Sequence, residues 1–325
     1  MKKATREAYG EILKKIGKDK NIYVLDADLS TSTKTIEFAK LYPDRFLNMG
    51  ISEQDMIGTA AGIALSGKTV FASSFAIFLV GKAYDQIRMA VGYNCANVKL
   101  VSSHAGLSPG EDGGTHQMLE DISMMRTMPN MRVFVPSDDI STKKIIQEVI
   151  KDELPAYIRL SRVQTDIVYD ENESFSLGKS KTIGNGLDGT IFAIGDVLER
   201  ALKAKEILKE EHNLDIRVID MYSIKPIDEK SIIKAAKETE ILLSLENHNI
   251  IGGLGSAISE VLTDNFPKKI KRMGINDSFG KSGAADKLLD EYGLSIEKIV
   301  DTFLEEYKKW RNILKEKLKE LLRID

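Results

Sequence analysis

Short apolar runs alternate with amphipathic helical patterns along this chain, and no other feature restricts its fold as strongly. The helical patterns lie near 3–17, 53–66, 79–92, 117–127 and 138–152. Nearly continuous apolar runs, typical of strands that are buried on both faces, lie at 21–27, 68–74, 97–103, 131–137 and 156–161. Strands and helices that alternate in this way predict a parallel sheet with helices on both faces.

A polar stretch over 166–188 interrupts this pattern, and a second alternation follows. Its apolar runs lie at 190–196, 216–221, 240–246 and 269–275, again with helical patterns between them. At about 150 residues per domain, a chain of 325 residues is long enough for two. We therefore predict an α/β protein of two domains, 1–165 and 189–325, joined by a linker at 166–188. Each domain is expected to be a largely parallel sheet flanked by helices.

Local signals also predict two helix features. Asp138, which follows Pro136 and precedes an amphipathic pattern, predicts the start of one helix. Residues 301–322 form a charged amphipathic pattern that predicts a terminal helix. Its apolar positions predict packing through Phe303, Tyr307, Trp310, Leu314 and Leu318.

Composition and charge exclude several classes of protein. The net charge of −3 argues against a nucleic-acid binder, which normally carries a basic surface. A single cysteine, Cys95, excludes an intramolecular disulfide framework. The N-terminal residues are charged throughout, unlike a signal peptide, and no apolar run approaches the length of a membrane span. We therefore expect a soluble, cytoplasmic protein.

Three motifs of known function are not supported by the residues around them. Gly184 to Gly189 fits G-x-G-x-x-G, but a strand pattern follows where a dinucleotide site needs a helix. Gly106 to Gly110 fits G-x-S-x-G, but Pro109 has no N–H to donate to an oxyanion. The four histidines lack metal-ligand spacing. These patterns argue against a dinucleotide fold, a hydrolase and a self-contained zinc site.

Two other segments carry chemistry. In the first, Ser52 is a candidate N-cap, and Glu53 opens a helix of small and apolar residues. Because such a helix packs closely, Glu53 is expected to be partly buried, which suits a proton-relaying acid. The second is the glycine-rich segment 103–116, which leaves the carboxyl end of a predicted strand, where α/β proteins bind ligands. It combines two histidines with an aspartate.

These segments resemble the C-terminal half of transketolase. The resemblance rests on GISEQDMIGTAAGIA, SFAIFL, SSHAGLSPGEDGGTHQMLED and YIRLSR within 1–165, and on GGLGSAISEVL at 252–262. It implies a pyrimidine-binding domain followed by a smaller C-terminal domain. It also implies a thiamine-diphosphate-dependent transfer of a two-carbon ketol unit, from a ketose such as xylulose 5-phosphate to an aldose such as ribose 5-phosphate. Such an enzyme belongs to the pentose phosphate pathway.

The resemblance assigns cofactor residues. Glu53 matches the family glutamate that contacts N1′ of the aminopyrimidine and thereby activates the cofactor, which then serves as an electron sink. Phe75 and Phe78 are similar to the aromatic residues that stack on this ring. The spacing beyond Phe78 departs from the family pattern by about one residue. Asp28 matches an aspartate near the thiazolium.

The resemblance also assigns substrate residues. His104 and His116 match histidines that contact substrate oxygens and phosphate, and these two join Glu53 as the expected catalytic residues. Asp112 matches the aspartate that recognises a sugar hydroxyl. The remaining matches, Arg6, Ser32 and Arg162, correspond to a grip on the sugar phosphate, for which a bidentate arginine is suited.

One family feature is missing, because the sequence has no GDG motif to hold Mg²⁺ and the diphosphate. The chain also begins almost directly at the pyrimidine-binding domain. The resemblance therefore implies half of a split enzyme, with a second polypeptide that supplies the diphosphate and Mg²⁺ domain and no metal ligands on this chain. Family sites form between subunits, so a heterotetramer with two copies of each chain is expected.

Other functions remain open at this stage. The beta subunit of a 2-oxo acid dehydrogenase has similar domains, and half of a split 1-deoxyxylulose-5-phosphate synthase would share the AYDQ sequence at 83–86. A scaffold subunit that has lost its chemistry is the non-enzymatic alternative. In the second domain the sequence offers few chemical groups: Glu246 and His248 are expected at the surface, and the domain is expected to be mainly structural.

Overall fold

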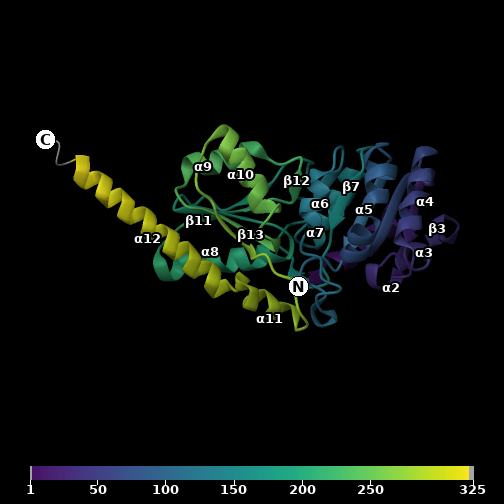
Figure 1. The fold of residues 1–325 in the computed structure, drawn as a ribbon, viewed down its shortest axis with the longest axis horizontal. Coiled ribbons are helices and arrows are strands. Elements are labelled where there is room, and N and C mark those ends of the chain that lie inside the picture. The colour runs from purple at the N-terminus through teal and green to yellow at the C-terminus, as the bar shows by residue number, and fades with distance from the viewer. Residues whose placement is uncertain (1, 322–325) are drawn as a thin grey trace.

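The computed structural model describes residues 2–321, which form two α/β halves side by side (Figure 1). The strands are β1 Lys2–Ala4, β2 Ile22–Asp26, β3 Phe46–Asn48, β4 Thr69–Phe75, β5 Val98–Ser103, β6 Arg132–Phe134, β7 Ala156–Arg159, β8 Gln164–Asp166, β9 Lys181–Ile183, β10 Gly189–Ala193, β11 Ile216–Asp220, β12 Ser223–Lys225, β13 Leu242–Asn249 and β14 Lys271–Ile275. The α-helices are α1 Thr5–Ile16, α2 Ser30–Thr33, α3 Ile36–Ala39, α4 Glu53–Leu65, α5 Ala83–Gln86, α6 Asp121–Thr127, α7 Asp139–Val149, α8 Leu198–His212, α9 Glu229–Glu238, α10 Leu254–Asn265, α11 Ala285–Leu289 and α12 Ile296–Leu321. The predicted α/β class is confirmed.

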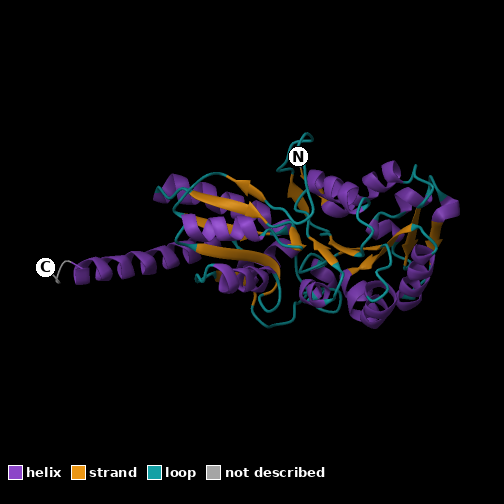
Figure 2. Ribbon diagram, turned by 90° about the horizontal axis from the view of Figure 1, so that it is seen from above, coloured by secondary structure: helices purple, strands orange, loops and turns teal. Residues whose placement is uncertain are grey.

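The first half contains a seven-stranded sheet of order β12-β6-β7-β5-β4-β2-β3. All of its neighbouring strands are parallel except β12, which pairs antiparallel with β6. Helices cover both faces (Figure 2): α1 packs with α7 and α3, whereas α4 packs with α5. Helix α7 begins as predicted, because Asp138 caps it through the backbone N–H of Ser141 at 2.7 Å.

The second half contains a five-stranded sheet of order β14-β13-β10-β11-β9. Strands β14, β13, β10 and β11 are parallel, and β9 pairs antiparallel with β11, so part of the polar stretch at 166–188 belongs to this sheet. Helix α8 packs with α12, and α9 packs with α10.

The two halves share strands and core. Strand β12 comes from the second half of the chain but completes the edge of the first sheet. One buried apolar cluster joins Phe134 and Ile158 of the first half to Val218 of the second, and another joins Tyr157 to Phe192. The interface between the halves is therefore part of the hydrophobic core.

Three local predictions need correction. The predicted helix at 79–92 contains only α5, flanked by π-helical turns at Ile77–Lys82 and Ile87–Gly92. Ser52 occupies the N-cap position of α4, but its hydroxyl donates to the Met49 carbonyl at 2.7 Å instead of capping the helix.

The third correction concerns the terminal helix α12, which extends away from the body of the molecule (Figure 1). Phe303 is buried, and Tyr307 contacts Trp310 with ring centroids 5.5 Å apart. Leu314 and Leu318, in contrast, are 42% and 49% exposed, so the predicted packing ends before them. The amphipathic pattern continues past the point where the second sheet and α8 can contact it.

Candidate functional site

The predicted site residues gather where the parallel strands of the first sheet end. Asp28 follows β2, Glu53 follows β3, and Phe75 is the last residue of β4. His104 follows β5, and Arg162 comes three residues after β7. Since the carboxyl ends of parallel strands share one edge of the sheet, residues far apart in sequence meet there, as expected for an α/β ligand site.

His104 lies at the centre of this group and is buried. Its Nε2 lies 3.3 Å from an N–H of Arg6, which can only donate, so Nε2 is the acceptor. Its Nδ1–H then donates to the Ser103 hydroxyl at 2.8 Å. Burial, with the nearby charges of Arg6 and Arg162, lowers the pKa of His104 to about 3. The imidazole is therefore neutral around pH 7, in a fixed tautomer.

A row of aromatic rings continues from His104. The ring of Phe75 stacks on it with centroids 3.7 Å apart, and Phe78 stacks on Phe75 at 5.8 Å. His116 meets the edge of Phe78 at 5.4 Å. The π-helical turn after β4 carries Phe78, so β4, its following turn and the glycine-rich segment build one apolar and aromatic wall.

Two arginines provide positive charge beside this wall. Arg6 donates to the Ser32 carbonyl at 3.0 Å, and its Nε is buried without a hydrogen-bond partner. Burial and the charge of Arg162 lower the pKa of Arg6. Arg162 pairs with Asp112 at 3.0 Å, and both line a pocket of about 340 Å³. A buried, unpartnered guanidinium N–H close to a second arginine suits an anion with several oxygens.

Glu53 is the first residue of α4 and is 2% exposed. Its Oε2 accepts a hydrogen bond from Lys82 Nζ at 2.5 Å, and Lys82 also lies over the ring of Phe78, 5.7 Å from its centroid. Contacts thus run continuously from Glu53 through Lys82, Phe78 and Phe75 to His104. The prediction that Glu53 is buried at the start of this helix is in accord with the structure.

Asp28 also lies at this edge, but within residues 2–321 it forms no hydrogen bond or ion pair with another predicted site residue. The side chain of Asp28 is exposed, and its backbone has a positive φ of 61°. Its carboxylate accepts a hydrogen bond from Asn48 Nδ2 at 3.1 Å. The neighbouring Asp26 is fully buried and accepts from the Leu29 N–H and the hydroxyls of Thr33 and Thr35 at 2.6–2.8 Å. Asp26 therefore holds the segment 29–35, which includes the short helix α2 and Ser32, and a carboxylate at the end of an apolar run was its only sequence signal.

The expectation that Glu246 and His248 lie at the surface is wrong, because both are fully buried. Glu246 accepts from the backbone N–H groups of Leu254 and Gly255 at 2.7 and 2.9 Å, at the start of α10. A Cβ at Gly253 would lie 1.9 Å from a carboxylate oxygen of Glu246, so this glycine is required. Burial raises the pKa of Glu246 to about 7.

The second half of the chain also supports the site directly. Asn247, on β13, accepts from the Leu107 N–H at 3.0 Å, just beyond His104. Gly106 has φ of 63°, and a Cβ there would lie 2.6 Å from the Asn247 amide. Arg159 donates to the Asn247 carbonyl at 2.9 Å. The expectation of a mainly structural second domain therefore needs refinement, because β13 holds the loop that follows His104.

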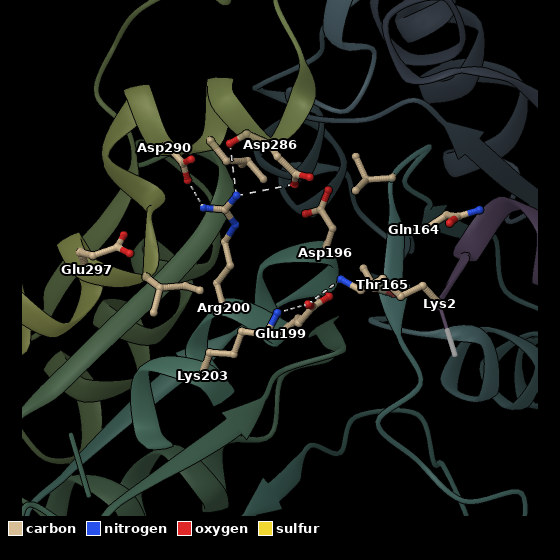
Figure 3. Close-up of a pocket in the computed structure, with 13 residues that line it drawn as sticks. Lys2, Gln164, Thr165, Asp196, Glu199, Arg200, Lys203, Asp286, Asp290 and Glu297 are labelled. Atoms are coloured by element: carbon tan, nitrogen blue, oxygen red, sulfur yellow. Dashed lines mark hydrogen bonds and ion pairs between the residues drawn. The ribbon is translucent and has the colours of Figure 1, made fainter. Parts of the chain in front are cut away.

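A separate pocket of about 260 Å³ lies between the halves (Figure 3). Its charges come from β1, α8 and the segment that leads into α12, and they are largely paired with one another. Lys2 contacts Glu199 at 2.8 Å, and Arg200 contacts Asp290. This pocket contains none of the predicted site residues.

Comparison with known proteins identifies the family. Residues 1–166 match the transketolase pyrimidine-binding domain, and residues 178–299 match the transketolase C-terminal domain. A Methanocaldococcus jannaschii chain, assigned by name as the C-terminal section of a transketolase, is 49% identical over 311 residues, which covers 94% of this chain and 97% of that one. A 6-deoxy-6-sulfo-D-fructose transketolase subunit of a Clostridium species is 36% identical, covering 91% and 92%.

A solved structure and a longer relative point to the same family. A structure titled as a split gene transketolase, in an inactive beta4 tetramer, is 41% identical with a TM-score of 0.85, covering 94% of this chain and 98% of that one. Human transketolase is 38% identical over 90% of this chain, which spans only 47% of the human protein. The fold and these matches define a two-domain α/β protein with a transketolase-type pyrimidine-binding domain and a transketolase-type C-terminal domain. The chain belongs to the transketolase family and corresponds to its C-terminal part.

Two features are absent from residues 2–321. No cluster of histidine, cysteine, aspartate and glutamate in this part of the chain has the geometry of a metal site. Among the same residues, no helix combines the length and the apolar character that crossing a membrane requires.

Proposed function

We propose that this chain is the C-terminal subunit of a two-polypeptide transketolase that uses thiamine diphosphate. It would transfer a two-carbon ketol unit from a ketose phosphate, such as xylulose 5-phosphate, to an aldose phosphate, such as ribose 5-phosphate. The observation that carries this proposal is the row of Glu53, Phe78, Phe75 and His104 at one sheet edge, with Arg6 at its end.

The residues present fit the aminopyrimidine half of the cofactor. Glu53 is buried, and within residues 2–321 no donor is bonded to its Oε1, which is thus available to N1′ of the ring. Phe75 and Phe78 offer aromatic surface beside it. When bound, thiamine diphosphate supplies a carbanion and an electron sink for cleavage of a carbon–carbon bond. Glu53 would hold a proton at N1′.

The other residues would act on the sugar. Neutral His104 can exchange the hydrogen bond that its Nε2 accepts from Arg6 for one accepted from a substrate hydroxyl, while Ser103 fixes its tautomer. Arg6 and Arg162 would bind the terminal phosphate, and Asp112 a sugar hydroxyl. The charges support binding of the phosphate, because burial and the nearby charge of Arg162 both lower the pKa of Arg6.

We propose that a second polypeptide holds the diphosphate and Mg²⁺. Support comes from length, since this chain spans about half of human transketolase but nearly all of relatives named as a section or a subunit. The assembly proposed is two copies of each chain, with the cofactor between unlike chains.

The test is a ketol-transfer assay on this chain mixed with the matching N-terminal-half polypeptide, thiamine diphosphate, Mg²⁺, xylulose 5-phosphate and ribose 5-phosphate. Sedoheptulose 7-phosphate should form only when both chains are present. Turnover by this chain alone would refute the two-polypeptide proposal, and a folded, cofactor-bound complex without product would refute these substrates.

A second donor belongs in the same assay. One relative, 36% identical, is named for 6-deoxy-6-sulfo-D-fructose, whose sulfonate has the tetrahedral oxyanion shape of a phosphate ester. Arg6 and Arg162 could bind either group through the same N–H donors. Comparing kcat/KM for the two donors decides which anionic end the site prefers.

A further inference from the structure

Lys82 occupies a place that the roles assigned so far do not explain. It ends the π-helical turn Ile77–Lys82, and its Nζ contacts Glu53 Oε2 at 2.5 Å. The ammonium is also 5.7 Å from the centroid of Phe78, within the range of a cation–π contact. One lysine thus touches both the proposed proton-holding carboxylate and a residue of the proposed ring-stacking wall.

The two partners differ in their access to water. The side chain of Glu53 is 2% exposed, whereas that of Lys82 is 45% exposed. A carboxylate this deeply buried requires a compensating charge or hydrogen bonds, because removing an ion from water is costly. Lys82 supplies that charge from the solvent side. The nearest acidic neighbour on α4, Asp55, is exposed and would repel rather than stabilise the Glu53 charge.

The backbone around Lys82 is also unusual. Residues 77–82 and 87–92 are π-helical turns on either side of α5. Such turns widen a helix by one residue and are frequent at functional sites, where they redirect a side chain. Here the first turn carries both Phe78 and Lys82, so it fixes the aromatic ring and the ammonium relative to each other.

The contact uses only one carboxylate oxygen. Lys82 holds Oε2, while Oε1 has no donor bonded to it within the described part of the chain. A carboxylate anchored through one oxygen keeps the other in a defined position.

We propose that Lys82 is a positioning residue for cofactor activation. It anchors Glu53 through Oε2 and leaves Oε1 for N1′ of the aminopyrimidine. This inference rests on the proposed function in requiring thiamine diphosphate and the second polypeptide, and it is independent of the sugar substrates.

The test follows the exchange of the C2 proton of bound thiamine diphosphate with D₂O, measured by quenched-flow NMR on the complex of both polypeptides. Because exchange needs no sugar, it works even if the proposed substrates are wrong. Lys82→Met should slow exchange by about tenfold or more, while the Kd for thiamine diphosphate, from calorimetry, should change less than about threefold. Lys82→Arg should restore most of the rate.

Two comparisons separate positioning from a general structural effect. In a Glu53→Gln background, Lys82→Met should slow exchange no further, since Lys82 acts through that carboxylate. Lys68→Met, at a lysine bonded to Asn21 elsewhere in the same half, should leave exchange unchanged. The proposal is overturned if Lys82→Met exchanges at the native rate, or if its effect persists in full once Glu53 is glutamine.

Discussion

Substitution of Arg159 by methionine should destabilise the whole chain. Arg159 is buried on β7, and its Nε donates to the fully buried Asp121 at 2.7 Å. Without it, Asp121 would keep only the Tyr157 hydroxyl at 2.6 Å, because its other oxygen already has no partner. His248 lies 3.9 Å away, but burial lowers its pKa to about 4, so it is neutral at pH 7 and supplies no charge. The bond from Arg159 to the Asn247 carbonyl would also be lost.

An unpaired buried carboxylate of this kind costs about 3–5 kcal/mol of unfolding free energy. The assay is urea denaturation at pH 7, followed by circular dichroism. The control is Arg132→Met, which removes a partly exposed pair with Asp152 at 2.9 Å and should cost less than about 1 kcal/mol. Adding Asp121→Leu to Arg159→Met should recover much of the loss. Equal losses for Arg132 and Arg159 would refute the reasoning.

Three further predictions concern the site and pH. Glu53→Gln should retain the native circular dichroism spectrum but lose about 10²-fold or more in turnover of the assembled enzyme; normal turnover would exclude Glu53 as the proton-holding group. Gly106→Ala should weaken thiamine-diphosphate-dependent activity and lower stability, because the new Cβ meets the Asn247 amide at 2.6 Å with φ of 63°; an unchanged melting temperature would contradict this. Burial raises the pKa of Asp220 from 3.8 to about 7. Between these two pH values the folded state holds a proton that the unfolded state releases. The free energy of unfolding should therefore fall as the pH rises from about 4 to about 7. Asp220→Asn should flatten this fall; an equally steep profile would argue against it.

The sequence predicted the elements well where local signals determine them. The predicted apolar runs are strands in the structure, and Asp138 caps the helix that follows it. Both features were predictable because hydrophobic periodicity and capping act over a few residues. The carboxyl edge of the sheet was also predictable, since parallel strands bring Glu53 and His104 to one side. The place of each residue in the sequence was enough to predict these features.

Features that depend on distant parts of the chain were not predictable. Glu246 and His248 sit in a polar sequence that resembles a surface turn, yet α10 and the first half bury both. The contact between Lys82 and Glu53 depends on a π-helical turn that the apolar pattern at 79–92 does not distinguish from an α-helix. For Leu314 and Leu318 the opposite holds: the sequence has the apolar positions of a packed helix, but both residues are exposed because no other element within residues 2–321 packs against them.

Strand β12 has a consequence for how this chain can be divided. It pairs with β6 at the edge of the first sheet, although it lies more than fifty residues beyond Arg162 in the sequence. A fragment that ended at residue 165 would keep the pairing of β6 with β7 but leave the backbone groups on the other side of β6 unpaired, and an exposed strand edge promotes association with other chains. The limits of the pyrimidine-binding region are therefore set by which strands pair in the structure, not by a single continuous stretch of sequence. The smallest unit that completes its sheet includes Ser223 to Lys225.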